Sequence, residues 1–254
     1  MTPAALRDRA ADAFACLRER RPAVHCLTNT VAQAFTANCL LALGCYPSMT
    51  DSKDEVKHFV AAADALLVNL GTLSMPRSEA IGLAIDAAQK KSMPWVLDPV
   101  FVELSPPRAE FARRLLFEKP AIVRGNAREI AALVGAAPEH AARQLAGNGG
   151  LVVVETGEVD TVSDVNGVSR IANGTPLLAS ITASGCAGAA ITAALHAVDP
   201  DPTVAAVAGL LVTGIAGEQA AADSAGPGSF VIHFIDRLSR LRPEDIVAHA
   251  KVST

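Results

Sequence analysis

Residues 65–99, ALLVNLGTLSMPRSEAIGLAIDAAQKKSMPWVLDP, decide the fold class of this chain. The apolar run over 65–70 predicts a buried strand that ends at Gly71-Thr72, and residues 76–91 predict a helix with a proline near its first turn. Residues 95–97 predict a second strand, which ends at Asp98-Pro99. A strand, a helix and a strand in this order form a βαβ unit, in which the two strands lie parallel.

The same alternation extends to both sides of this unit. It predicts further strands over 23–27, 45–49, 121–123 and 151–154. It predicts further helices over 4–20, 31–43, 52–63, 108–118, 127–134 and 138–145, with a capping box at 52–55 and a turn at 147–150. A hairpin that turns at Asn166-Gly167 then leads to helices over 189–195, 203–222, 230–241 and 243–251. We therefore expect one α/β domain over residues 1–254, with a mostly parallel central sheet.

Composition excludes several classes of protein. The 254 residues carry a net charge of −4 without a basic block, so we expect no nucleic-acid partner. No stretch reaches the roughly 18 uninterrupted apolar residues of a membrane span, and residues 1–21 lack the apolar run of a signal peptide. Five cysteines without a C-x-x-C pair fit a reducing compartment better than a disulfide framework, so we expect a cytoplasmic protein.

Small residues gather in the stretch SITASGCAGA at 180–189, directly before an alanine-rich helix. A loop of small residues that opens a helix leaves backbone N–H groups unpaired at the positive end of the helix dipole, and this favours binding of an anion, phosphate above all. Cys186 lies on the first turn, where the dipole would lower the pKa of its thiol and favour the thiolate. The alternative is a small, buried and inert cysteine.

Polar residues follow the predicted strands at their carboxyl ends, where open α/β sheets bind ligands. These residues are Asn29, Asp98, Arg124, Asn126 and Thr156. Asn126 and Glu129 form an N-x-x-E pattern, in which Glu129 fits either complementation of a helix dipole or a carboxylate that binds Mg²⁺ through water. The sequence has no P-loop, no G-x-G-x-x-G after its first strand, no zinc-ligand spacing and no G-x-S-x-G elbow.

Eight segments, in order along the chain, carry a resemblance to a known family. They are HCLTN (25–29), LLALG (40–44), PSM (47–49), NLGTL (69–73), LDPV (97–100), RGNAREI (124–130), TGEVD (156–160) and GPGSF (226–230). From about residue 25 to 245 the chain resembles the hydroxyethylthiazole kinases of the ribokinase-like superfamily. The resemblance implies a three-layer α/β/α sandwich, phosphoryl transfer from ATP to the hydroxyl of 4-methyl-5-(2-hydroxyethyl)thiazole in thiamine salvage, and a homotrimer with active sites between subunits.

The resemblance also implies a role for each candidate site residue. Asn29, Met49, Gly71, Thr72 and Ala183 would line the thiazole pocket. Arg124, Asn126 and Thr156 would contact ATP, and Asp98 and Glu129 would serve Mg²⁺ and the phosphates. Ser184, Gly185 and Cys186 would form the catalytic turn, whose N–H groups help to neutralise the γ-phosphate. Cys186 falls where most of the superfamily carries an aspartate base, and both a base and an orienting group for the acceptor hydroxyl remain open for it.

The chain departs from the family pattern at two places. The family loop usually reads Gly-(Ala/Thr)-Gly-Cys, whereas here it reads Ala183-Ser184-Gly185-Cys186. If position 183 needs a positive φ angle, Ala183 costs about 1 kcal/mol or more. The segment between residues 130 and 151 is also shorter than in many relatives. Two other functions stay open: another ribokinase-like enzyme, such as a hydroxymethylpyrimidine kinase or a dehydratase of hydrated NAD(P)H, and a non-catalytic protein that binds thiazole or thiamine.

Overall fold

The computed structural model describes residues 1–254, apart from the side chain of Asn148. The described residues form a nine-stranded sheet of order β2-β1-β3-β4-β5-β6-β7-β8-β9. Strands β1 to β6 pair in parallel, and β7 to β9 extend the sheet by antiparallel pairing. The strands are β1 (Ala23–Leu27), β2 (Tyr46–Ser48), β3 (Ala65–Asn69), β4 (Trp95–Asp98), β5 (Ile122–Asn126), β6 (Val152–Thr156), β7 (Asp160–Asp164), β8 (Gly167–Ile171) and β9 (Val252–Ser253).

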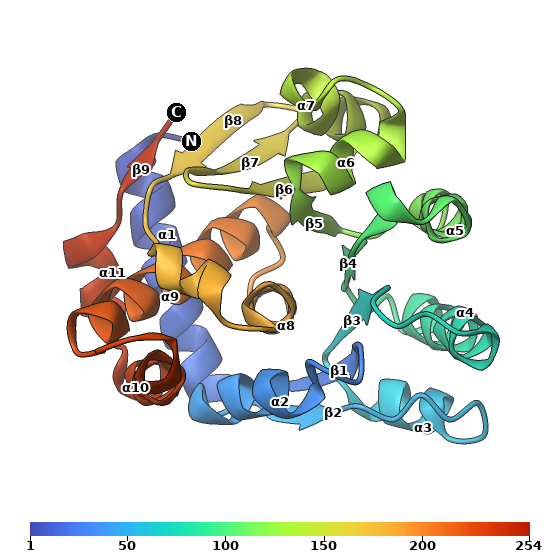
Figure 1. Cartoon of the computed structure of the whole chain (residues 1–254), viewed down its shortest axis with the longest axis horizontal. Helices are drawn as coiled ribbons and strands as arrows, with labels where there is room; N and C mark the ends of the chain where they lie inside the picture. Colours follow the sequence, from blue (N-terminus) through green and yellow to red (C-terminus); the bar gives the residue numbers. More distant parts are fainter.

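Helices cover both faces of this sheet, which confirms the predicted three-layer α/β/α architecture (Figure 1). One layer holds α3 (Val56–Ala62), α4 (Met75–Lys90), α5 (Pro106–Leu116), α6 (Ala127–Val134) and α7 (Pro138–Gly149). The other holds α1 (Pro3–Arg20), α2 (Gln33–Ala42), α8 (Ser184–His196), α9 (Pro202–Ala222), α10 (Pro227–Arg240) and α11 (Pro243–His249). Two short 3₁₀ helices, η1 (Val102–Leu104) and η2 (Pro176–Ser180), lie in the connections.

The sheet separates two apolar cores because side chains alternate along each strand. All five residues of β3 are buried. Leu67 packs into the core formed with α8 and α9, whereas Leu66 and Val68 pack into the core formed with α3 to α7. Strands buried on both faces read as continuous apolar runs, which is why this stretch identified the fold.

Helix α9 is apolar around its whole circumference because it lies at the centre of its layer. Its composition and length would allow it to cross a bilayer, but 83% of its most apolar window is buried inside the protein. It contacts α1, α8 and α10. The helix therefore serves as the core of its layer.

Three local predictions are wrong. The capping box at residues 52–55 does not form: α3 begins at Val56, and the Glu55 carboxylate instead accepts a hydrogen bond from Thr50 Oγ1 at 2.5 Å. The turn expected at 147–150 is the last turn of α7, which ends at Gly150 in the left-handed conformation (φ 62°). The terminal helix is shorter than expected, and the chain continues into β9.

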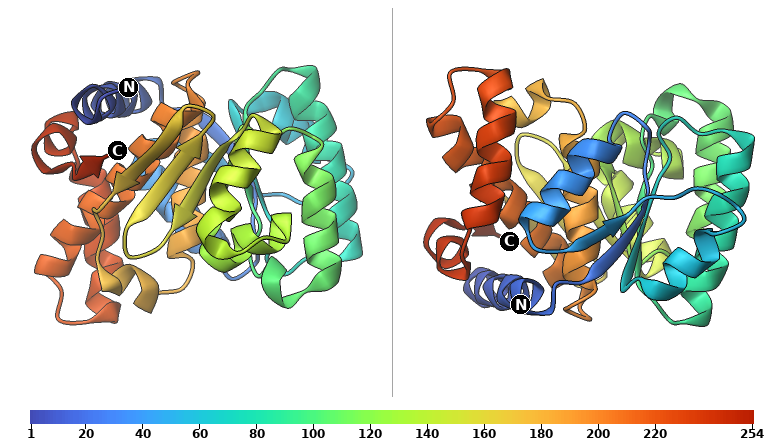
Figure 2. Two further views of the ribbon diagram at one scale, coloured as in Figure 1. Left: turned by 90° about the horizontal axis from the view of Figure 1, so that it is seen from above. Right: turned by 90° about the horizontal axis from the view of Figure 1, so that it is seen from below.

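Strand β9 adds a ninth strand to the sheet by pairing with β8, as Val252 lies opposite Ile171. The side chain of Asn173 supports this junction, because its Oδ1 accepts a hydrogen bond from the backbone N–H of Lys251 at 2.7 Å. The two ends of the chain consequently lie near each other on one side of the molecule (Figures 1 and 2).

Candidate active site

Side chains from three parallel strands and from α8 converge at the carboxyl edge of the sheet. Asn29 follows β1, Asn69 ends β3, Asp98 ends β4, and Cys186 lies on the first turn of α8. The amides of Asn29 and Asn69 each donate from Nδ2 to Cys186 Sγ at 3.2 Å. Asn69 Nδ2 also donates to Asp98 Oδ2 at 2.6 Å. The structure therefore brings together Asn29, Asp98 and Cys186, three residues that the sequence predicted as separate candidates for the site.

Asn69 is the residue of this cluster that sequence reasoning missed as a site residue. Its side chain is fully buried, and its Oδ1 accepts from Gly71 N at 3.0 Å and from Asn29 Nδ2 at 3.2 Å. Because Asn69 lies within an apolar run, the sequence predicts only that it belongs to a strand. The signal that could have found it is its position, since a polar residue ends a buried strand in register with Asp98.

Cys186 does not have the depressed pKa that its helix position predicted. Burial raises the pKa of its thiol to about 12, the charge of Asp98 acts in the same direction, and the two amides and Arg124 lower it. The prediction of a thiolate is therefore wrong, because Cys186 is only 9% exposed and the loss of water around its thiol is the largest influence on the pKa. Cys186 is a neutral thiol at pH 7.

Two carboxylates lie near each other in the fold: Asp98 ends β4, and Glu129 lies on the first turn of α6, just after the neighbouring strand β5. Burial raises the pKa of Asp98 to about 7, with Glu129 acting in the same direction and Arg124 and Asn69 against it. Burial also raises the pKa of Glu129, although its carboxylate accepts from Phe101 N at 2.9 Å and Asn126 N at 2.8 Å. Mg²⁺ and similar cations take one or two carboxylates together with water and phosphate oxygens, so this pair fits a divalent cation without a third acidic ligand.

Arg124 joins β5 to the start of α8. Its Nη1 donates to the backbone carbonyl of Gly185 at 2.8 Å. A Cβ atom on Gly188 would lie 2.8 Å from Nη2, so the glycine allows the guanidinium to lie against the helix. Its positive charge lowers the pKa values of Asp98, Glu129 and Cys186. One cation thus acts on every acidic group of the cluster.

The first turn of α8 keeps its backbone N–H groups without a side-chain cap. Ala183, its N-cap residue, has φ 69° and ψ 2° and therefore does adopt the left-handed conformation considered above. Ser184 Oγ donates to the Leu178 carbonyl at 2.7 Å and so ties the helix start to η2. The N–H groups of residues 184–186 remain directed outward at the positive end of the helix, which suits an anion.

The loop after β3 is held against Asn29 by close packing. A Cβ atom on Gly71 would lie 2.8 Å from Asn29 Cβ, so only glycine allows this approach. Thr72 has φ 48°, and its Oγ1 accepts from Arg77. The buried Arg77 guanidinium also donates to the carbonyls of Leu27 (2.9 Å), Asn69 (2.8 Å) and Gly71. These bonds fix the carboxyl ends of β1 and β3 relative to each other.

The remaining candidate residues surround this cluster. Asn126 caps α6, because its Oδ1 accepts from the N–H groups of Arg128 (2.9 Å) and Glu129 (3.0 Å). Thr156 ends β6 and donates weakly to Gly125 O at 3.4 Å. Met49 is half-buried just after the edge strand β2, next to β1. The structure therefore places them along the same edge of the sheet, without direct contacts to Cys186.

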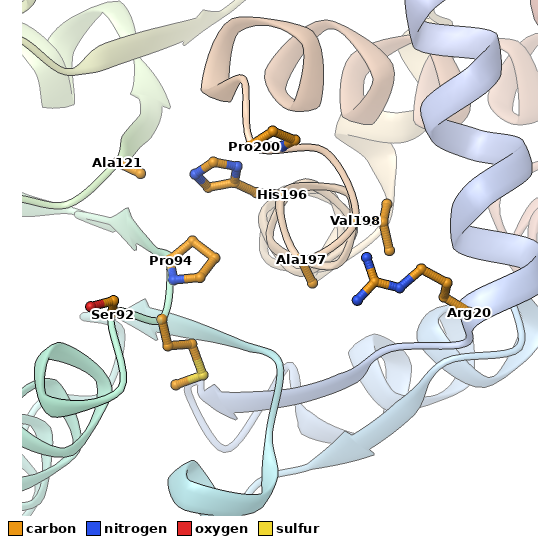
Figure 3. Close-up of a pocket in the computed structure, with 9 residues that line it drawn as sticks. Arg20, Ser92, Pro94, Ala121, His196, Ala197, Val198 and Pro200 are labelled. Atoms are coloured by element: carbon orange, nitrogen blue, oxygen red, sulfur yellow. The ribbon is translucent and has the colours of Figure 1, made fainter.

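A separate pocket of about 480 Å³ opens at the opposite, amino-terminal end of the strands (Figure 3). It lies between Pro94 and Ala121, which precede β4 and β5, and the end of α8. His196 is its one buried ionisable side chain, and none of its nine lining residues is Asp or Glu. The chemistry-bearing residues are therefore concentrated at the carboxyl edge.

Comparison with known proteins gives one family over most of the chain. The model of the hydroxyethylthiazole kinase family matches residues 14–244. The chain is 44% identical over 244 residues to the probable hydroxyethylthiazole kinase of Agrobacterium fabrum (strain C58), covering 96% of this chain and 94% of that protein. It is 45% identical over 255 residues to the hydroxyethylthiazole kinase of Granulibacter bethesdensis, covering 95% and 93%.

Solved structures agree with this result. The hydroxyethylthiazole kinase protein from Pyrococcus horikoshii OT3 superposes with a TM-score of 0.90 at 35% identity, covering 96% of this chain and 98% of that chain. A ribokinase-like superfamily protein from Enterococcus faecalis V583 superposes with a TM-score of 0.67 at 13% identity, covering 91% and 95%. The second likeness shows the ribokinase-like fold alone.

Proposed function

Because the chain belongs to the hydroxyethylthiazole kinase family, we propose that it transfers the γ-phosphoryl group of ATP to the hydroxyl group of 4-methyl-5-(2-hydroxyethyl)thiazole, in thiamine salvage. One observation carries the proposal. Cys186 lies within hydrogen-bond distance of two buried amides and on the helix turn whose N–H groups lack a side-chain cap. An alcohol beside the thiol would therefore lie next to a site for phosphate.

The acceptor side of the site is assigned to residues around β1, β3 and the start of α8. They are Asn29, Met49, Gly71, Thr72 and Ala183. The close approach of Gly71 to Asn29 supports this assignment, because it leaves no side chain between the loop and the amide.

Cys186 is assigned to orient the acceptor hydroxyl. Phosphoryl transfer passes through a loose transition state, in which the attacking oxygen needs little prior deprotonation. A thiol whose pKa is near 12 is a poor base at the start of the reaction. The neutral thiol already holds its own proton, so Cys186 orients the hydroxyl by hydrogen bonding while the amides of Asn29 and Asn69 hold the sulfur. The hydroxyl proton passes to an oxygen of the transferred phosphoryl group as the ester bond forms.

The phosphate side is assigned to α8 and to the ends of β4, β5 and β6. Ser184 and Gly185 present first-turn N–H groups to the γ-phosphate, and Arg124, Asn126 and Thr156 contact ATP. Asp98 and Glu129 would hold Mg²⁺, with Glu129 acting through water. The cation, when bound, neutralises phosphate charge.

We further propose that residues 1–254 form one kinase domain that acts in the cytoplasm as a homotrimer with sites between subunits. Large apolar side chains exposed around β1, β2 and α4 support an assembly: Val31 (65% exposed), Leu41 (56%), Tyr46 (62%) and Met75 (75%). The unpaired state of the five cysteines agrees with a reducing compartment. Sedimentation velocity tests the assembly, and a mass near the 26.2 kDa of one chain would contradict it.

The function is tested by ADP formation from ATP with the thiazole alcohol, with and without Mg²⁺. We expect turnover that requires both the alcohol and the metal. Hydroxymethylpyrimidine in place of the thiazole is the matched substrate control, and faster turnover with it would assign the alternative kinase activity. Binding of the thiazole alcohol by calorimetry without any ADP formation would replace the kinase by a thiazole-binding protein.

A further inference from the structure

We propose that Asn69 is a positioning residue for this reaction: one buried amide that holds Cys186 and Asp98 with its nitrogen, and Gly71 and Asn29 with its oxygen. The inference rests on the proposed function, since it concerns the same site. It adds a residue that connects the alcohol-binding side of the site to the phosphate-binding side.

The neighbours of Asn69 allow only one orientation of its amide. The backbone N–H of Gly71 can only donate, so the atom that faces it at 3.0 Å is Oδ1. The nitrogen then faces Asp98 Oδ2 at 2.6 Å and Cys186 Sγ at 3.2 Å. A half-turn of the amide would set Oδ1 against the Asp98 carboxylate and Nδ2 against the Gly71 N–H. Both hydrogens and both oxygen lone pairs of Asn69 are thus used inside the site.

This arrangement also orients the thiol of Cys186. A neutral thiol has two sulfur lone pairs, and the two amide donors, Asn69 and Asn29, occupy both. The S–H bond must then point away from both amides. Asn69 therefore helps to decide in which direction the S–H group of Cys186 can donate a hydrogen bond to an alcohol.

The burial of Asn69 limits it to an indirect role. With 0% exposure it cannot touch a substrate, so any effect on turnover must pass through Cys186, Asp98, Asn29 or Gly71. Its backbone is held separately, because its carbonyl accepts from Arg77 at 2.8 Å and β3 pairs with β1 and β4 on either side. Replacing the side chain should therefore disturb the site while the strand stays in place.

The experiment compares Asn69→Ala with Asn173→Ala. Asn173 is a matched control: it is 4% exposed, its amide also makes several hydrogen bonds, and it lies by β9 rather than in the site. We expect Asn69→Ala to lower kcat about 10- to 100-fold, the loss expected for a buried hydrogen bond to a charged group, and Asn173→Ala to leave kcat of the folded protein within about twofold.

A double-mutant cycle with Cys186→Ala separates positioning from loss of fold. We expect Cys186→Ala to cost much less, about threefold or less, once Asn69 is already alanine, because residues that act together are not additive. Multiplicative effects of the two substitutions, or an unchanged kcat in Asn69→Ala, would overturn the inference. If Asn69→Ala does not fold, Asn69→Ser enters the same cycle under the same criteria.

A wild-type protein without turnover would refute the proposed function rather than the role of Asn69. In that case calorimetric binding of the alcohol tests Asn69 alone, and we expect weaker binding to Asn69→Ala than to the wild type.

Discussion

Replacement of Ala183 by glycine tests whether the start of α8 is strained. Ala183 has φ 69° and ψ 2°, a left-handed conformation that costs an L-residue about 1–2 kcal/mol and glycine almost nothing. Glycine loses about 0.5–1 kcal/mol more backbone entropy on folding. The net expectation is that Ala183→Gly raises the free energy of unfolding by about 0.5–1 kcal/mol.

Ala137→Gly is the matched control for this change. Ala137 is also an N-cap residue without a side-chain hydrogen bond, but it has φ −64° and ψ 142°, a conformation that alanine adopts freely. The entropy loss and the N-cap preference are common to both substitutions and cancel in the comparison. The unfolding free energies should therefore differ between the two variants by about 1–2 kcal/mol in favour of Ala183→Gly, the size of the backbone term.

Equilibrium unfolding in urea, followed by far-ultraviolet circular dichroism, measures this difference. Protein concentration is held fixed across the variants, because assembly would add to the apparent stability. Equal changes at positions 137 and 183 would refute the argument that Ala183 is strained. A higher free energy of unfolding in Ala183→Gly together with altered turnover would show that the strained conformation of Ala183 affects the activity of the site.

Three further predictions concern charge and packing. Burial lowers the pKa of His25 to about 4, so below pH 6.5 the unfolded chain takes up a proton that the folded protein excludes. The free energy of unfolding should therefore fall by about 3 kcal/mol as the pH drops from 6.5 to 4. Urea unfolding of His25→Gln at both pH values should lack this loss. Gly188→Ala places a methyl carbon 2.8 Å from Arg124 Nη2, and the displaced guanidinium should raise the KM for ATP about tenfold while calorimetric binding of the alcohol stays constant; an unchanged KM would contradict the role of Arg124. Cys186→Ala should lower kcat, whereas Cys186→Asp should keep or raise it, because a carboxylate can both orient the acceptor hydroxyl and accept its proton. An unchanged kcat in Cys186→Ala would contradict the role of Cys186 in orienting the hydroxyl.

The order and type of the main elements could be predicted because their patterns are long. Strands β1 and β3 to β6 are mostly buried apolar runs, and each is separated from the next by at least a helix-length segment. Strand β2 is a short edge strand whose residues are exposed or half-buried. Strand β9 could not be predicted, since two residues, Val252 and Ser253, carry no periodicity and pair only because the chain end lies beside β8. The capping-box pattern at residues 52–55 gave a wrong helix start, because α3 begins only at Val56 and Glu55 accepts from Thr50 instead.

The site was predictable in its location but less so in its energetics. Polar residues at strand ends identified the carboxyl edge of the sheet, and this is a rule of parallel topology rather than of any one residue. Asn69 was not predicted as a site residue because its contact with Cys186 joins residues 117 positions apart in the sequence. The predicted direction of the Cys186 pKa shift was wrong, because the sequence shows the helix start and its dipole but not how deeply the sulfur is buried. Burial depends on all the residues packed around the sulfur.

The wide separation of the site residues along the chain bears on its synthesis. Asn29 and Cys186, whose side chains touch, are 157 positions apart. At roughly 5–20 residues per second, a ribosome adds Asn29 about 8–30 s before it adds Cys186. A growing chain therefore has most of its parallel sheet but no complete site, and it cannot consume ATP or sequester the alcohol before α8 is made. Phosphoryl transfer thus becomes available only after α8 has been made.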